Sequence, residues 1–153
     1  MNKEELQVVA TNRKARRDYF IDLSVEAGII LLGSEVKSIR EGNINLKDSY
    51  AVYREGEIFL IGTHIGPYKP ANRNNHAPER ERKLLLNRRE IDKLGGRITE
   101  RGFTLVPLRV YIRNSRVKVE LGLGRGKKSY DKRETIAKRD FEREKSREWK
   151  YRR

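Results

Sequence analysis

The sequence predicts a mainly β fold with short helices, in which antiparallel strands close into a small barrel and a basic tail follows at the C-terminal end. Short segments that alternate apolar and polar residues are separated by turn residues. No strand–helix–strand rhythm points to a parallel sheet, and apolar residues become sparse after residue 124. The 153 residues leave room for one modest core and an appendage.

The N-terminal region predicts two strands and a short helix. Residues 8–10 and 19–32 are rich in apolar and β-branched residues, with an interruption expected at residues 26–28. Ser34 stands where a helix N-cap is expected, and Gly42 is expected to end that helix. The strands are expected to be half-buried in a sheet.

Two β-hairpins are predicted by turn residues between alternating segments. In the first, strands at residues 50–53 and 58–61 flank a compact loop in which Gly56 is available for a positive φ. In the second, residues 103–112 and 117–123 alternate on either side of a short polar turn. Antiparallel pairing is therefore expected along both hairpins.

The region between the hairpins predicts a loop and two helices. Residues 66–78 contain three of the four prolines and several asparagines, so they are expected to form an exposed loop. Residues 79–86 and 88–94 show helical spacing of leucine and isoleucine, with Gly95 and Gly96 as the stop signal. Two linked helices are expected there.

Five or six short antiparallel strands with few helices favour a barrel with an oligonucleotide-binding (OB) type core. A split α+β sheet is the alternative. The predicted organisation is an OB-like RNA-binding barrel domain at residues 1–124 and a basic C-terminal tail at residues 125–153. The tail pairs opposite charges at helical spacing but has few apolar residues to bury. It is expected to be disordered when free and helical on a partner.

The charge of the chain predicts a polyanionic partner. Lys and Arg number 36 against 22 acidic residues, which gives a formal net charge of +14. Residues 125–153 carry 13 basic and 6 acidic side chains, and residues 69–101 carry 10 and 5, whereas residues 21–68 carry 4 and 7. This concentration favours directed contact with nucleic acid. The alternative is the general surface charge of an abundant protein.

A cytoplasmic location is expected, and a membrane partner is disfavoured. No apolar run approaches roughly 18 residues, and the N-terminal residues lack a hydrophobic region of signal-peptide type. The excess positive charge is not accompanied by a long helix with an apolar face, which binding to a membrane surface would require.

The residue inventory argues against catalysis, a cofactor or a metal site. The chain has no cysteine, and its two histidines lack any paired ligand spacing. His64 is expected to be structural or an RNA-facing donor, and His76 a solvated loop residue. A glycine run at residues 122–126 precedes two lysines, but a phosphate-binding P-loop would need Gly at position 121 and Ser or Thr at position 128. The chain is predicted to be a binding protein and not an enzyme.

Three further features each have two interpretations. The glycine run either lets the backbone pass close to a phosphate chain or forms a flexible exit from the last strand. The basic cluster at residues 12–17 either contacts RNA or is a solvated lead into the next strand, and the second interpretation is slightly favoured. Four aromatic residues either stack on unpaired bases or pack in the core, which is favoured for most of them. These residues are Tyr19, Tyr50, Tyr53 and Phe59.

Six short motifs lie in order along nearly the whole chain. They are Asn12-Arg13-Lys14-Ala15, Glu26-Ala27-Gly28, Gly33-Ser34-Glu35-Val36-Lys37-Ser38, Arg80-x-Arg82-Lys83-Leu84-Leu85-Leu86, Lys118-Val119 and Gly126-Lys127-Lys128-x-Tyr130-Asp131-Lys132-Arg133. Any one motif alone is weak. Taken together in this order, they resemble the SmpB family, the SsrA-binding proteins that bind transfer-messenger RNA in trans-translation.

The resemblance implies an RNA-binding adaptor with an OB-type barrel. Such a protein binds the tRNA-like domain of transfer-messenger RNA and delivers it to stalled ribosomes. Its tail occupies the vacant mRNA channel at the decoding centre of the small subunit and becomes helical there. Elongation factor Tu is implied as a partner in the delivery complex, through the RNA. The alternative is a constitutive ribosomal or ribosome-assembly protein.

The resemblance also assigns individual residues. The RNA-binding face is expected to include Asn12, Arg13, Lys14, Glu26, Lys83, Leu85 and Lys118. The ribosome-binding tail is expected to include Gly126, Lys127, Lys128, Tyr130, Asp131, Lys132, Arg133 and Trp149. Without the resemblance, Glu26 would be taken as an ordinary surface acid. Family tails often carry an aliphatic pair where this chain has Glu148 and Trp149, so Trp149 is expected to substitute by stacking or burial.

Overall fold

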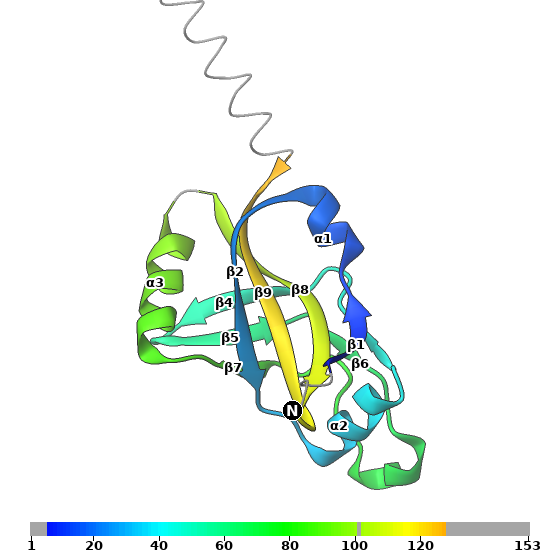
Figure 1. Ribbon diagram of the computed structural model, residues 1–153. Coiled ribbons are helices and arrows are strands. Elements are labelled where there is room, and N and C mark those ends of the chain that lie inside the picture. The colour runs from blue at the N-terminus through cyan, green and yellow to red at the C-terminus, as the bar shows by residue number, and fades with distance from the viewer. Residues whose placement is uncertain (1–5, 101, 128–153) are drawn as a thin grey trace, which may run out of the picture.

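The computed structural model describes residues 6–100 and 102–127 (Figure 1). Within these ranges the chain forms nine strands, three α-helices and one 3₁₀ helix. The tail expected to be disordered when free spans residues 125–153. Residues 125 and 126 are wrongly included in it, because they belong to strand β9 (Arg116–Gly126), and residues 128–153 lie outside the described residues.

Six of the described strands close into a barrel (Figure 1). Their bounds are β2 Tyr19–Ile29, β4 Tyr50–Arg54, β5 Glu57–Ile61, β7 Arg82–Leu85, β8 Phe103–Arg113 and β9 Arg116–Gly126. Each pairs antiparallel with the next in the order β2, β9, β8, β4, β5, β7 and back to β2. Because the ring closes, the predicted mainly β barrel is confirmed, and the split α+β sheet is excluded.

The other elements lie around this barrel. The free edge of β8 pairs with β1, two very short strands pair with each other, helix α1 packs on β8 and β2, and α3 lies against β4 and β8. The bounds are β1 Leu6–Thr11, α1 Arg13–Asp18, α2 Gly33–Arg40, β3 Ile44–Asn45, β6 His64–Ile65, η1 Lys69–Asn74 and α3 Arg88–Thr99.

Both predicted hairpins are confirmed, and each turns through two residues with positive φ. Glu55 (φ 52°) and Gly56 (φ 75°) join β4 to β5, and Asn114 (φ 50°) and Ser115 (φ 64°) join β8 to β9. Two successive left-handed residues give the turn a twist that matches the right-handed twist of the paired strands. The turn residues therefore fix the register of both hairpins.

The core fills the barrel interior with alternate residues of each strand. In β9, Val119, Leu121 and Leu123 are fully buried, whereas Lys118 before them and Glu120 between the first two remain partly exposed. Successive side chains of a strand point to opposite faces, so the same alternation that fills the core also places charged groups on the outer surface.

The helix expected at residues 79–86 is wrong, because this segment contains strand β7. Arg82 and Leu84 are buried, while Lys83 and Leu85 face outward. A run of leucines suits a helix or a strand equally well. This segment is a strand because it pairs with β5 on one side and with β2 on the other.

The ends of β2 and α2 also differ from expectation. β2 is not interrupted at residues 26–28, since its pairing with β9 continues through Gly28, and it ends at Ile29. α2 begins at Gly33, before the expected cap at Ser34. The side chain of Glu35 accepts a hydrogen bond from the backbone N–H of Leu32 at 2.7 Å, so the N-cap is Leu32, two residues before the expected position.

α3 continues through the two glycines that were expected to stop it. A Cβ atom on Gly95 would lie 2.6 Å from the ring of Tyr53 on β4, so the missing side chain lets the helix pack closely against the barrel. A Cβ atom on Gly96 would meet open space. Close packing, and not helix termination, explains Gly95.

His76 is buried and not solvated as expected. It is 6% exposed, its Nδ1 lies 2.8 Å from the Ser34 hydroxyl, and its Nε2 lies 2.9 Å from the carbonyl oxygen of Ile65. The imidazole thus ties the long loop to α2 and β6.

A buried ionic cluster fastens α2 to β7. Glu35 and Arg82 are both fully buried, and Arg82 Nε donates to Glu35 Oε2 at 2.6 Å while Arg80 Nη2 donates to Oε1 at 2.5 Å. Burial by itself would raise the pKa of Glu35, but the hydrogen bonds from Arg80, the Leu32 backbone and Arg82 outweigh it and lower the pKa below its ordinary value. The carboxylate is therefore ionised at neutral pH.

We predict that Glu35→Gln lowers the free energy of unfolding by about 3 kcal/mol at pH 7, because the buried Arg82 would keep its charge without a counterion. A group with a depressed pKa stabilises the fold above its unfolded pKa, and that stability is lost as the pH falls through the folded value. The difference in the free energy of unfolding between the wild type and Glu35→Gln should therefore become smaller below about pH 4.5. Urea unfolding at several pH values measures this difference.

The matched control is Glu81→Gln. Glu81 is exposed and pairs with Arg54 at 2.7 Å on the surface, where ion pairs contribute little. Equal losses of stability in the two variants would contradict the role given to the buried pair.

Candidate nucleic-acid interface

Three strands bring two of the predicted RNA-binding residues into one row. Gly28 of β2 pairs with Leu85 of β7 on one side and with Lys118 of β9 on the other. Directly paired residues share a face of the sheet, so the three positions lie side by side on the outside of the barrel. A Cβ atom on Gly28 would lie 3.3 Å from the Cβ of Leu85, so the glycine leaves room for the leucine side chain.

Two more predicted residues extend this row. Lys83 lies two residues before Leu85 on β7, and Glu26 lies two residues before Gly28 on β2, so both share the outer face. We call the surface formed by Glu26, Lys83, Leu85 and Lys118 the seam surface, because it covers the junction of β7, β2 and β9. The structure thus brings four of the seven predicted residues together.

The seam surface combines apolar area with positive charge. Leu85 is 49% exposed, and the neighbouring Ile30, whose backbone N–H donates to the Lys83 carbonyl at 3.0 Å, is 46% exposed. Lys83 pairs with Glu57 at 2.7 Å, whereas Lys118 forms no ion pair with any residue in the described ranges. Exposed apolar side chains rimmed by cations are suited to a partner with both flat faces and negative charge.

Glu26 is held in place by two neighbours from β8. Arg113 Nη1 lies 2.5 Å from Glu26 Oε2, and the Tyr111 hydroxyl also bonds to Glu26. Burial, followed by this carboxylate, raises the pKa of Tyr111 to about 12, so the phenol stays protonated and donates. The guanidiniums of Arg109 and Arg113 lie over the Tyr111 ring at 4.9 and 5.4 Å from its centroid. The carboxylate is therefore fixed in position.

The other three predicted residues lie at the opposite end of the barrel. Tyr19 pairs with Gly126 at one end of the β2–β9 ladder, and Gly28 pairs with Lys118 at the other. Nine residues of strand separate the two ends by about 30 Å. Residues 12–14 precede β2 and stand at the Tyr19 end, so the structure does not bring them next to the seam surface.

Asn12 is a structural residue and does not face outward as expected. It is 6% exposed, its side-chain oxygen accepts from the Ala15 N–H at 3.1 Å, and its amide donates to the carbonyls of Pro107 at 2.9 Å and Leu46 at 3.3 Å. These contacts cap α1 and fasten it to two other segments. The basic cluster at residues 12–17 therefore forms a capped helix, which contradicts the favoured interpretation as a simple lead into the strand.

Arg13 and Lys14 are exposed on α1, and Lys14 is already paired. Lys14 Nζ lies 2.7 Å from Asp48 Oδ1. The hydrogen bond to Asp48 raises the pKa of Lys14, and the same bond lowers the pKa of Asp48. Both groups are charged at neutral pH, and the pair links α1 to the turn before β4.

The glycine run is part of β9 as far as Gly126, so it is not a flexible exit over residues 122–126. A Cβ atom on Gly122 would lie 2.8 Å from a methyl of Leu108, and one on Gly124 would lie 2.5 Å from the carbonyl oxygen of Phe20. These two glycines are therefore needed for close packing. β9 ends at Gly126, Lys127 is the last described residue, and the remaining predicted tail residues lie outside the described part of the chain.

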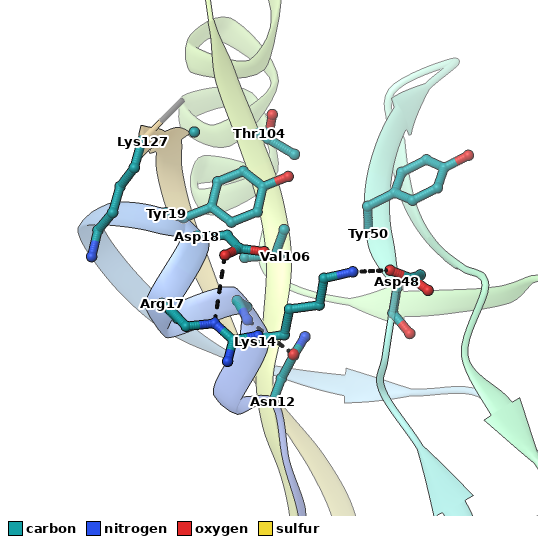
Figure 2. A pocket seen from close by; sticks show the side chains of 13 residues that line it. Asn12, Lys14, Arg17, Asp18, Tyr19, Asp48, Tyr50, Thr104, Val106 and Lys127 are labelled. Atoms are coloured by element: carbon teal, nitrogen blue, oxygen red, sulfur yellow. Dashed lines mark hydrogen bonds and ion pairs between the residues drawn. The ribbon is translucent and has the colours of Figure 1, made fainter. Parts of the chain in front are cut away.

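A pocket of about 690 Å³ opens at the Tyr19 end of the barrel (Figure 2). Helix α1, the turn before β4, the start of β8 and the end of β9 form its walls. Figure 2 shows Lys14 reaching across it from α1 to Asp48, with Tyr19 and Tyr50 on strands at either side. No local pattern predicts this pocket, because the segments that form its walls are distant in the chain.

A model of the SmpB protein family matches residues 9–151 of this chain. The chain belongs to the SmpB family. The SsrA-binding protein of Acetivibrio thermocellus is 61% identical over 144 residues and covers 94% of each chain. That of Halothermothrix orenii is 53% identical over 152 residues, covering 99% of this chain and 98% of the relative.

A solved structure described as "tmRNA-SmpB: a journey to the center of the bacterial ribosome" is also similar. It is 44% identical, has a TM-score of 0.66, and the match covers 77% of this chain and 83% of that one. The predicted family resemblance is therefore confirmed for both sequence and fold.

The described parts of this SmpB-family chain contain no group of three or more His, Asp or Glu side chains that could hold a metal ion. None of the helices in those same ranges is long and apolar enough to cross a membrane. Reasoning from sequence missed Tyr111 and Arg113 as partners of Glu26. The signal available was the alternation in β8, which places Arg109, Tyr111 and Arg113 on one face.

We predict that Asn12→Ala lowers the free energy of unfolding by about 2 kcal/mol, since it removes a helix cap and the side-chain amide that donates to the carbonyls of Pro107 and Leu46. Asn87→Ala is the control, because Asn87 caps α3 through its bond to Glu90 N–H but is exposed. That variant should lose about 1 kcal/mol or less. Thermal and urea unfolding compare the two, and a smaller loss for Asn12 than for Asn87 would contradict the structural role.

Proposed function

We propose that this SmpB-family protein binds the tRNA-like domain of transfer-messenger RNA and delivers it to stalled ribosomes. The observation that carries the proposal is its 61% and 53% identity, over nearly the whole chain, to proteins that bind SsrA. The similar solved structure, whose description names transfer-messenger RNA, SmpB and the ribosome, supports both partners. Family membership also confirms the prediction of a binding protein and not an enzyme.

The seam surface is our candidate for the contact with the tRNA-like domain. Lys83 and Lys118 would lie on backbone phosphates and release counterions, which gives affinity that falls with salt. Leu85 would pack against the face of an unstacked base or a ribose, because loops and elbows of folded RNA expose such surfaces. This combination selects an RNA shape over a sequence.

Glu26 would supply discrimination within that surface. A carboxylate accepts hydrogen bonds from ribose hydroxyls and base amino groups and repels phosphates, so it favours one placement of the RNA over others. Arg113 and the Tyr111 hydroxyl hold the carboxylate before the RNA arrives. Little rotamer freedom then remains to be lost on binding.

We further propose that the basic segment at residues 125–153, which leaves the barrel where β9 ends at Gly126, acts as a tail on the ribosome. β9 carries the chain to Gly126 and Lys127 at the end of the barrel remote from the seam surface. From there, the tail would enter the vacant mRNA channel and become helical on small-subunit RNA. The proposed contacts are Gly126, Lys127, Lys128, Tyr130, Asp131, Lys132, Arg133 and Trp149. Elongation factor Tu would join the complex through the RNA.

Removing the tail separates the two activities. We predict that a chain ending at Tyr130 binds transfer-messenger RNA as tightly as the full chain, because the seam surface is intact, but no longer supports tagging on stalled ribosomes. Lys118→Ala, in contrast, should weaken binding to transfer-messenger RNA itself. It should also reduce the slope of log affinity against log salt concentration by about 1, because one phosphate contact is lost. Filter binding over a salt series and a tagging assay measure these effects.

Lys93→Ala serves as the matched control, because Lys93 is an exposed lysine on α3 outside the seam surface. If truncation itself abolished RNA binding, the proposed division between barrel and tail would be wrong. If the protein were found in equal amount on translating and stalled ribosomes, the constitutive ribosomal alternative would be correct.

A further inference from the structure

The pocket at the Tyr19 end has features that the proposed contacts of the seam surface and the tail leave unused. Its volume of about 690 Å³ falls within the range of sites for small ligands, about 300–1,000 Å³. The hydroxyls of Tyr19, Tyr50 and Thr104 line it and form no hydrogen bond with any residue of the described ranges. Three free hydroxyls around one pocket offer donors and acceptors to a ligand.

Two aromatic rings supply flat apolar faces in this pocket. Tyr50 is 43% exposed, and it faces outward because its neighbour Ala51 points into the core. Tyr19 packs on the small cluster of Ala15, Val106 and Leu108 beneath α1, which holds its ring in place. Figure 2 shows the two rings on opposite walls, one at the start of β2 and one at the start of β4.

Three cations and two carboxylates line the pocket. Lys14 pairs with Asp48, and Arg17 Nε lies 3.8 Å from Asp18 Oδ1, so Lys127 is the surplus positive charge among the lining residues. The Lys14–Asp48 pair is exposed, with 44% and 68% of the two side chains accessible, so it can exchange for another anion at little cost. Lys127 lies with its ammonium 5.2 Å from the centre of the Phe20 ring, at the edge of the pocket.

We propose that this pocket receives one unpaired nucleotide of an RNA, with the base against the tyrosine rings and the phosphates toward Lys14, Arg17 and Lys127. Aromatic side chains stack on bases of any sequence, and nearby cations hold the backbone. The free hydroxyls would reach the polar edge of the base. An apolar ligand would leave those hydroxyls without partners, and a bare anion would not use the rings.

The position of the pocket indicates that the RNA whose nucleotide it receives is ribosomal RNA. This assignment rests on the proposed function, in which the tRNA-like domain occupies the seam surface. Along β2, seven residues or about 23 Å separate Glu26, the nearest residue of that surface, from Tyr19 in the pocket. Gly126 and Lys127, where the described chain ends, form part of the pocket wall. A tail that follows small-subunit RNA therefore starts beside the pocket, and an unpaired ribosomal nucleotide is its nearest RNA ligand.

The test compares three variants of the full chain, each bound to transfer-messenger RNA. Tyr50→Leu removes the ring, Tyr50→Phe keeps the ring without its hydroxyl, and Tyr68→Leu is the control, because Tyr68 is a partly buried tyrosine outside the pocket. Affinity for stalled ribosomes and chemical probing of ribosomal bases are the readouts. Circular dichroism establishes that each variant is folded.

With Tyr50→Leu, we expect affinity for stalled ribosomes to fall roughly 5- to 100-fold, the loss typical of one stacked base. One unpaired ribosomal base that the wild-type protein protects should become reactive. Tyr50→Phe should retain the protection and most of the affinity, and Tyr68→Leu should behave as wild type. Affinity for isolated transfer-messenger RNA should be unchanged in all three.

Identical ribosomal footprints for the wild type and Tyr50→Leu would overturn the proposal. Loss of affinity for isolated transfer-messenger RNA would assign the pocket to that RNA and overturn the ribosomal source. Failure of the wild-type protein to bind transfer-messenger RNA would instead contradict the proposed function. The three failures are thus distinguishable.

Discussion

The buried ion pair between Glu35 and Arg82 holds the barrel closed at the sparsely paired junction of β2 and β7. β2 and β7 share two register pairs, Gly28 with Leu85 and Ile29 with Leu84, whereas β2 and β9 are paired over most of their length. Arg82 belongs to β7, and Glu35 lies on the helix that follows β2. Their bond at 2.6 Å spans this junction where backbone pairing is sparse. The position of Leu85 beside Lys118 depends on it.

Closure of the barrel gives the protein two separate ends. The junction of β7, β2 and β9 presents an apolar and cationic surface, and the Tyr19 end presents a pocket and the start of the tail. An adaptor between two RNAs needs one surface for each of them. The β2–β9 ladder, about 30 Å from Gly28 to Tyr19, keeps the seam surface and the Tyr19 end apart without a conformational change.

The sequence predicted the parts of the fold that local chemistry determines. Both hairpins followed from turn residues, and the outward position of Lys118 followed from alternation in β9. The leucine run at residues 84–86 is compatible with a helix or a strand, so the predicted helix is wrong there, and only pairing with β5 and β2 determines that β7 is a strand. Local patterns do not predict the buried positions of Asn12, His76 and Glu35, because their hydrogen-bond partners are distant in the chain. The pocket was missed for the same reason.

The most direct test of this division is methyl NMR of the full chain as the isolated tRNA-like domain is added. If the seam surface holds this RNA, the exposed methyl groups of Leu85 and Ile30 should shift, while that of Thr104 in the pocket should stay in place. A shift at Thr104 with Leu85 and Ile30 unchanged would place the RNA at the wrong end of the barrel and contradict the account.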